Sequence, residues 1–320
     1  MKRFRLLGLL AGLLWGVGGT AAAQALADTL VFTPMSTAQA QFAGYYVALE
    51  QGFYAEEGLE VRIVHPFASQ DAVDTIRDGE CQATILPLSL AMRTVDQGLP
   101  LVNILQTSMN SATLIISRWG EDPRKMRGAK VAAFRAGFGQ LARSFAEMED
   151  LDYQWVTTAS ASAVNLFFSG AVDATLGRSY DEYYKILSSG LVDPDKGIYR
   201  FEDGEYNIQQ DGVYMTRDYF ETHRRQAEAF ARASRRGWDW AAEHPDETLE
   251  VVMRHVRQDR IATNRTLQKL MLQEVLRLQK DHETGERAFR IRPDMVEKAD
   301  DMLIRAGRIS RKITLEDLLP

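Results

Sequence analysis

Two kinds of side chain in this sequence are suited to binding a flat organic ligand: aromatic rings, and hydrogen-bonding groups at predicted strand ends. Phe42 and Tyr45 are three residues apart in a segment with helical spacing, and each ring could stack on a planar molecule. Aromatic residues at this spacing are also typical of helix packing in a core, so both interpretations stay open. Tyr46 points to another part of the helix, where we expect a structural role.

Polar residues follow several predicted strands and could line a binding site. Arg135 and Arg178 each follow a strand, and a guanidinium can hold an anion with two parallel hydrogen bonds. An ordinary salt bridge is the alternative for both. Glu182 begins a predicted helix, where the helix dipole favours an acid even without a ligand. The other candidates in this group are Ser89, Ser108, Asn110, Tyr180, Asp211 and Tyr214.

A glycine-rich segment follows one predicted strand and opens a helix. Its sequence is Gly137-Phe138-Gly139-Gln140-Leu141-Ala142, and its context is that of a dinucleotide-binding fingerprint. The first 25 residues resemble a signal peptide, and an exported protein would not encounter cytoplasmic dinucleotides. We therefore prefer a turn in which Gly137, Phe138 and Gly139 present backbone N–H groups to another ligand, and a turn without any ligand is the alternative.

Signals for catalysis or metal binding are weak in the sequence. The five histidines are scattered without metal-ligand spacing, and a G-x-S-x-G nucleophile motif does not occur. His65 lies near a predicted strand end, where we favour a partly buried structural histidine. Cys81 is the only cysteine, so an intrachain disulfide is excluded and we expect a buried thiol. We predict a binding protein without a cofactor, a metal or enzymatic activity.

Strand and helix signals alternate along the first two-thirds of the chain, which predicts parallel α/β sheets. The spacing of Val73 and Gly79 before a strand at 82–86 is repeated by Val164 and Gly170 before a strand at 172–176, which favours two lobes. Ligands of open α/β sheets bind beyond the carboxyl ends of strands, so two facing lobes would form a cleft. Long helices follow, and the first is expected as one helix over 220–242.

The first 25 residues have the features of a signal peptide. Basic residues in the first five positions precede an apolar run over 6–17, and Ala23-Gln24-Ala25 is a cleavage pattern. Cleavage after Ala27 is an alternative, and a membrane anchor is disfavoured because the apolar run is short. The net charge of −6, without a basic stripe, gives no indication of nucleic-acid binding.

Residues 39–64 contain the pattern Q-F-A-G-Y-Y-V-A-x-E-x-G-F-Y-x-E-x-G-L-x-V. This pattern resembles the extracytoplasmic solute-binding proteins of ABC importers. Within them it is most similar to the branch that binds thiamine pyrimidine precursors and, more distantly, alkanesulfonates. The resemblance covers roughly residues 29–240, and the helices beyond it match only in general character.

The resemblance implies the type II periplasmic binding protein fold, an α/β fold with a ligand cleft between two lobes and extra C-terminal helices. The expected division is a signal peptide at 1–25, a first lobe from 26–117 and 212–320, and a second lobe from 118–211. Strands near Ile115 and Val213 would cross between the lobes as a hinge. The same resemblance assigns Tyr45 as a stacking face and Glu182 as the acceptor for a ring edge, one from each lobe.

The function implied is transport without catalysis. We expect a periplasmic monomer that binds a small heteroaromatic such as a thiamine pyrimidine precursor and delivers it to an ABC permease in the inner membrane. The fungal pyrimidine-precursor synthases resemble this family, but their cysteine-rich centre has no counterpart here. The alternatives are an alkanesulfonate or other small solute as ligand, a sensing module partnered with a membrane sensor kinase, and a secreted enzyme.

Overall fold

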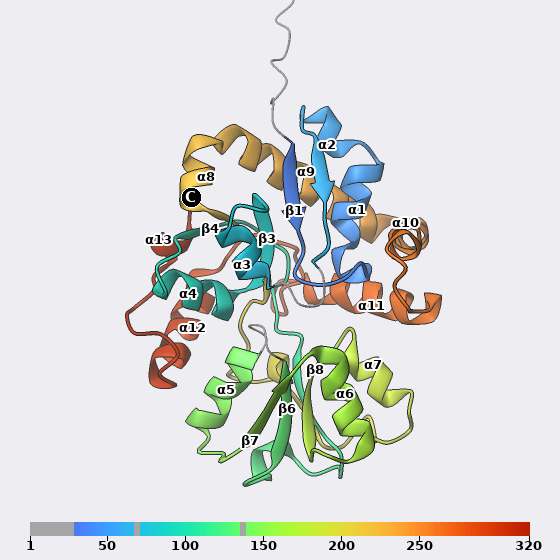
Figure 1. Cartoon of the computed structure of the whole chain (residues 1–320), viewed down its shortest axis with the longest axis vertical. Coiled ribbons are helices and arrows are strands. Elements are labelled where there is room, and N and C mark those ends of the chain that lie inside the picture. The colour runs from blue at the N-terminus through green and yellow to red at the C-terminus, as the bar shows by residue number, and fades with distance from the viewer. Residues whose placement is uncertain (1–28, 67–70, 135–138) are drawn as a thin grey trace, which may run out of the picture.

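The computed structural model describes residues 29–66, 71–134 and 139–320, arranged as two lobes stacked along the long axis (Figure 1). Each lobe contains one five-stranded mixed sheet with helices packed against it. The expected α/β architecture is therefore confirmed. The predicted signal peptide at 1–25 lies outside the described residues. Among the residues that the structure describes, no helix is both long and apolar enough to span a membrane.

The sheet of the first lobe has the strand order β2-β1-β3-β10-β4. The strands are β1 (Leu30–Thr33), β2 (Val61–Ile63), β3 (Ala83–Pro87), β4 (Leu101–Gln106) and β10 (Asp211–Thr216). β1, β2 and β3 run parallel, but β10 runs antiparallel to both β3 and β4. The predicted parallel pairing is confirmed for β1, β2 and β3 but not for β10, because β10 re-enters the first lobe from the second and so runs against its neighbours.

Helices cover both faces of this sheet. The N-terminal part contributes η1 (Ala40–Phe42), α1 (Ala43–Glu50), α2 (Phe53–Glu56), α3 (Ala72–Arg77) and α4 (Leu88–Asp96). The C-terminal part contributes α8 (Arg217–Thr222), α9 (Arg224–Glu243), α10 (Pro245–Gln258), α11 (Arg265–Leu278), α12 (Pro293–Arg305) and α13 (Leu315–Leu318). The single helix expected over 220–242 is two helices, because the chain leaves helical geometry at His223 (φ −125°, ψ 32°).

The closest helix packing in the first lobe is between α1 and α9. A Cβ built on Gly237 would lie 2.1 Å from the carbonyl oxygen of Gly44, and a Cβ on Gly44 would lie 2.2 Å from the Trp238 ring. Only glycine leaves room for such an approach. The two glycines therefore fix the position of α1, which follows η1 and its cleft residues.

The sheet of the second lobe has the order β7-β6-β8-β5-β9. Its strands are β5 (Thr113–Ser117), β6 (Lys130–Phe134), β7 (Gln154–Thr158), β8 (Ala174–Arg178) and β9 (Ile198–Arg200). The helices are α5 (Gly139–Met148), α6 (Ser160–Ser169) and α7 (Glu182–Leu187), with short turns η2 (Pro123–Lys125) and η3 (Phe201–Asp203). The predicted helix–glycine–strand repeat is confirmed, because Gly79 after α3 and Gly170 after α6 both adopt positive φ (74° and 75°) before β3 and β8.

The chain crosses between the lobes through residues 107–112 and returns through 207–210. β5 belongs wholly to the second sheet, so the first crossing lies before Thr113 and not at Ile115, as the sequence suggested. The amide of Ser111 donates to Asn207 Oδ1 (2.9 Å), which ties the two crossings together. A third segment braces them, since Asn110 Nδ2 donates to the Lys280 carbonyl (2.8 Å) and the Arg292 amide donates to Gln209 Oε1 (2.7 Å).

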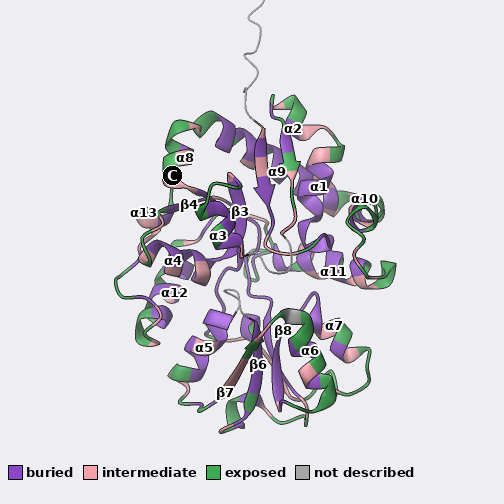
Figure 2. Cartoon of the chain, in the orientation of Figure 1, coloured by how far each residue is buried: buried purple, intermediate pink, exposed green. Residues whose placement is uncertain are grey.

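The lobes are in contact on both sides of these crossings. α5 of the second lobe packs against α4 and α12 of the first, and one apolar cluster includes residues of all three helices. Arg277 of α11 donates to both carboxylate oxygens of Glu202 in η3 (2.8 and 2.7 Å). Figure 2 shows that the segments connecting the two lobes are largely buried, and the contacts across the junction give the structure of a closed two-lobed protein.

Candidate ligand-binding cleft

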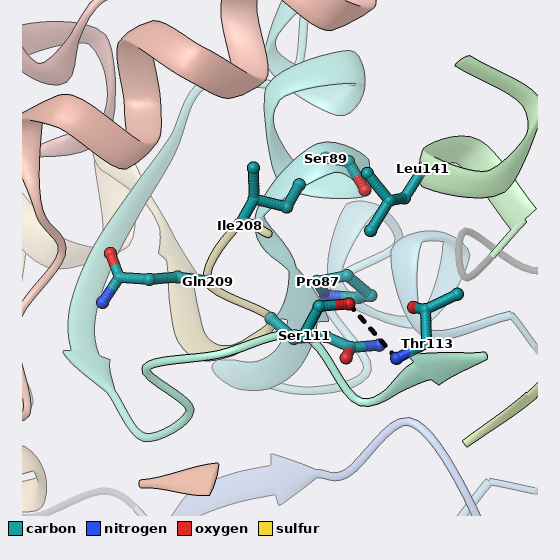
Figure 3. Close-up of a pocket in the computed structure, with 8 residues that line it drawn as sticks. Pro87, Ser89, Ser111, Thr113, Leu141, Ile208 and Gln209 are labelled. Carbon is teal, nitrogen blue, oxygen red and sulfur yellow. Dashed lines mark hydrogen bonds between the residues drawn. The ribbon is translucent and has the colours of Figure 1, made fainter. Parts of the chain in front are cut away.

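Strand ends of both lobes meet at the junction between them. Pro87 ends β3 and lies directly opposite Asp211, the first residue of β10. The amide of Leu88, the first residue of α4, donates to the Gln210 carbonyl (3.1 Å). A small cavity of about 10 Å³ remains here, lined by Pro87, Ser89, Ser111, Thr113, Leu141, Ile208, Gln209 and Gln210. Figure 3 shows Ser89 of α4 and Leu141 of α5 approaching one another across this cavity.

Asp211 is a buried carboxyl group at the junction. Its side-chain Oδ2 accepts a hydrogen bond from Gln41 Nε2 (2.7 Å), and Gln41 Oε1 accepts one from Gln39 Nε2 (2.8 Å). Asp211 Oδ1 has no hydrogen-bond partner among the described residues. Burial raises the pKa of Asp211, and the Gln41 bond and the charge of Arg178 oppose this rise. An unpaired buried acceptor of this kind calls for a physical explanation, and a donor on a ligand is one.

Arg178 ends β8 and is held by carboxylates of its own lobe. Its Nε donates to Glu182 Oε2 (2.9 Å), and its Nη2 donates to Asp181 Oδ2 (3.0 Å) and to Glu182 Oε1. Burial lowers the pKa of Arg178, but the charges of Glu182, Tyr180 and Asp181 and the hydrogen bonding to Glu182 together outweigh it, so the pKa lies well above its usual value. The sequence left a salt bridge open for this arginine, and the structure shows that salt bridge.

Glu182 is fully buried beneath the Arg178 side chain. Besides the guanidinium, its Oε2 accepts the backbone N–H of Arg178 (3.0 Å). Both carboxylate oxygens are thus engaged within the second lobe. The proposed role of Glu182 as acceptor for a ligand edge stays a prediction, but this geometry favours a structural role.

Tyr180 extends from the second lobe into the apolar core of the first. Its hydroxyl is buried and has no hydrogen-bond partner among the described residues. Burial raises the pKa of Tyr180, and the charge of Asp211 raises it further. Tyr180 and Asp211 therefore contribute unpaired buried oxygen atoms from opposite lobes.

The two predicted stacking residues are buried in the first lobe. The Tyr45 ring packs against Phe32 (ring centroids 4.7 Å apart) and edge-on against Trp238 (5.6 Å), and none of it is exposed. Its hydroxyl has no well-formed hydrogen bond. Phe42 is equally buried and lies beside His65 (5.5 Å). Core packing, the alternative weighed from the sequence, accounts for both rings.

The remaining predicted residues occupy different environments. Ser89 lines the cavity, whereas Ser108 Oγ donates to the Asn110 carbonyl (2.8 Å) and Asn110 braces the crossing segments. Tyr214 is buried within the first sheet, and its hydroxyl is unpaired among the described residues. Gly139 begins α5. Arg135, Gly137 and Phe138 lie outside the described residues.

Several cleft residues were missed by the sequence argument. Gln41 lies inside the motif over residues 39–64, but only the neighbouring aromatic residues were predicted to bind a ligand. Gln210 precedes Asp211, and its Oε1 accepts the Ala112 amide (2.5 Å). Thr113 and Leu141 carry no local signal, since only the contact between lobes brings them to the cavity.

His65 is a structural histidine, as expected. Its Nδ1 donates to the Ser36 carbonyl (2.6 Å), so Nε2 accepts from the Tyr46 hydroxyl (2.7 Å). Burial lowers the pKa of His65. Within residues 29–66, 71–134 and 139–320, no group of three or more His, Cys, Asp or Glu side chains is arranged to hold a metal ion.

Comparisons with known proteins identify relatives of this chain. Residues 39–248 match the model of the family described as NMT1/THI5 like. The formylaminopyrimidine-binding protein of Halalkalibacterium halodurans is 26% identical over 226 residues, which cover 65% of this chain and 64% of that relative. The match thus spans less than two-thirds of the relative's length.

Solved structures share the fold at low sequence identity. A Candida albicans protein described as having the generic periplasmic binding protein fold superposes with a TM-score of 0.64 at 14% identity, covering 89% of this chain and 92% of that one. The alkanesulfonate-binding protein SsuA from Xanthomonas axonopodis pv. citri, bound to MOPS, superposes with a TM-score of 0.65 at 10% identity, covering 91% and 97%. The periplasmic binding protein fold expected from the sequence is confirmed.

Proposed function

The chain belongs to the NMT1/THI5-like family, and on that premise we propose that it is the extracytoplasmic ligand-binding component of an ABC importer. The protein closes its two lobes around a small molecule and delivers it to a permease in the inner membrane. The signal-peptide features of residues 1–25 support export to the periplasm.

One observation carries the proposal: each lobe contributes an unpaired buried polar group near the junction between them. Asp211 Oδ1 comes from the first lobe and the Tyr180 hydroxyl from the second, and the described residues satisfy neither. A ligand that bonds to both groups would stabilise the closed form over the open one. That differential affinity is what drives closure of two-lobed binding proteins.

The ligand we propose is a small amino-substituted nitrogen heteroaromatic, of the kind named for the Halalkalibacterium halodurans relative. Ring nitrogens and amino groups can form hydrogen bonds with the carboxylate, amide and hydroxyl groups of the cleft. Buried aromatic walls such as Tyr180 suit a flat molecule. The cleft lies at the carboxyl ends of β3 and β8, where ligands of open α/β sheets bind.

Calorimetry with formylaminopyrimidine tests this function. The mature protein should bind one equivalent, and chromatography should recover the compound unchanged after prolonged incubation. Turnover products would contradict a pure binding role. Loss of formylaminopyrimidine uptake in cells that lack the protein, with the permease present, would support delivery to an importer.

An alkanesulfonate is the second candidate ligand, because the superposable SsuA protein was solved with the sulfonate MOPS bound. A sulfonate needs a cation or several free N–H donors. The guanidinium of Arg178 is already bonded to Asp181 and Glu182, which disfavours this candidate.

A further inference from the structure

The charges around the cleft are unevenly balanced. Asp181, Glu182 and Asp211 contribute three buried carboxyl groups, against the two cations Arg178 and Lys185, of which Lys185 pairs with Asp181 (2.6 Å) and Arg178 also acts on Asp211. Asp181 and Glu182 hold that guanidinium within the second lobe. Among the described residues, the electrostatic environment of Asp211 Oδ1 is therefore unfavourable for an anion and favourable for an N–H donor.

Asp211 lies at the junction between the two lobes. The residue begins β10 at the point where the chain returns from the second lobe, and its backbone carbonyl accepts the Thr107 amide (2.9 Å) and the Ser108 amide (3.0 Å) of the other crossing. Gln41 fixes the orientation of the carboxylate through Oδ2. Oδ1 is thus held in place by the hinge and by η1 while it remains available to a donor.

We propose that Asp211 selects the ligand by charge: its Oδ1 accepts an N–H group from a neutral or protonated amino-heteroaromatic, and the same carboxylate excludes sulfonates and phosphates. This inference rests on the proposed function and makes it more specific. Tyr180 belongs to the opposite lobe and reaches into the apolar core of the first, where its buried hydroxyl is unpaired among the described residues. Selection is therefore coupled to closure, because the ligand meets both groups only when the lobes are together.

Asp211→Asn tests this proposal, because it keeps the shape of the side chain and removes its charge. Calorimetry would compare formylaminopyrimidine with ethanesulfonate. We expect the variant to lose about ten- to a hundredfold in affinity for formylaminopyrimidine, as the loss of a charge-assisted hydrogen bond predicts. The ratio of the affinity for formylaminopyrimidine to the affinity for ethanesulfonate should therefore become smaller in the variant.

Asp300→Asn is the matched control. Asp300 is also buried, but its Oδ1 accepts the Ile313 amide (2.7 Å) within the first lobe and so is already satisfied. Its substitution should leave both affinities within about twofold, as expected for a site without shared contacts. Thermal melting verifies folding of both variants, and Asp211→Ser replaces Asp211→Asn if the latter does not fold.

The possible outcomes separate this inference from the proposed function. Unchanged pyrimidine affinity in Asp211→Asn overturns the role of Asp211 and leaves the proposed function intact. Tighter binding of ethanesulfonate than of formylaminopyrimidine by the unmodified protein overturns the charge selection. If the unmodified protein binds neither compound, the proposed ligand class and this inference fail together.

Discussion

His65 shows how a polar residue just after a strand end can serve folding instead of ligand binding. Both ring nitrogens are engaged, one by the Ser36 carbonyl and the other by the Tyr46 hydroxyl. The imidazole therefore fastens the loop after β1 to α1. Protonation would place a second proton where the Tyr46 hydroxyl now donates, and burial opposes the charge as well.

Stability should fall as the pH is lowered, in part because of His65. Its pKa in the folded protein lies below the value of 6.5 for an ordinary histidine, so the unfolded chain binds the proton more readily. The stabilising contribution is present above pH 6.5 and is lost as the pH falls through the lowered pKa. Urea unfolding at pH 7.5 and 5.5 should show a smaller pH effect in His65→Phe than in the unmodified protein. Equal pH effects would contradict this role.

Tyr45 should contribute to stability through its ring and not through its hydroxyl. The ring is packed against Phe32 and Trp238, whereas the buried hydroxyl lacks a well-formed hydrogen bond. We expect Tyr45→Ala to cost about 3–5 kcal/mol of unfolding free energy. Tyr45→Phe should cost less than about 1 kcal/mol, because the hydroxyl that it removes makes no well-formed hydrogen bond. Denaturant titration distinguishes them, and similar losses in both variants would show that the hydroxyl is essential.

At the scale of elements, the crossing of α1 and α9 depends on two glycines. A side chain at Gly237 meets the backbone of Gly44, which cannot rotate away as a flexible side chain would. Gly237→Ala should therefore lower the unfolding free energy by about 1–3 kcal/mol, the usual cost of overpacking. The favourable helix propensity of alanine opposes this loss only in part.

Arg225→Ala on the same helix provides the control for that measurement. Arg225 is exposed, so its replacement should change stability by less than about 0.5 kcal/mol. If Gly237→Ala proved as stable as the control, the tight crossing would not be needed for the fold.

At the scale of the whole molecule, ion pairs between the lobes should support ligand binding without touching the ligand. Arg277 bonds to both oxygens of the buried Glu202 only when the lobes are together. Arg277→Met should weaken formylaminopyrimidine binding by about tenfold, because hydrogen bonds to charged groups contribute roughly 1.5–3 kcal/mol. Arg305→Met is the control, because Arg305 pairs with Asp301 on the exposed surface of α12.

Closure itself should be visible in solution. Small-angle scattering of the ligand-free protein should give a larger radius of gyration than scattering at saturating formylaminopyrimidine, and the saturated value should match the closed structure. The Arg277→Met variant should need more ligand to reach the same value. An unchanged profile on ligand addition would argue against a hinge.

The sequence by itself determined most of the architecture. Period-two and helical patterns located the strands and helices, and the repeated spacing around Gly79 and Gly170 indicated two similar units, because these local signals depend only on neighbouring residues. The motif over residues 39–64 was sufficient to indicate the family. The break at His223 was missed because the apolar periodicity continues across it.

Only the tertiary structure decided which polar groups are available in the cleft. Arg178 and Glu182 looked like ligand contacts in sequence, but a buried charge is costly alone, and the fold satisfies each with the other. The only sequence evidence for Asp211 was its position near the predicted crossing between the lobes. Its orientation by Gln41, 170 residues away in sequence, and its unpaired oxygen depend on contacts between distant segments, which no local pattern encodes.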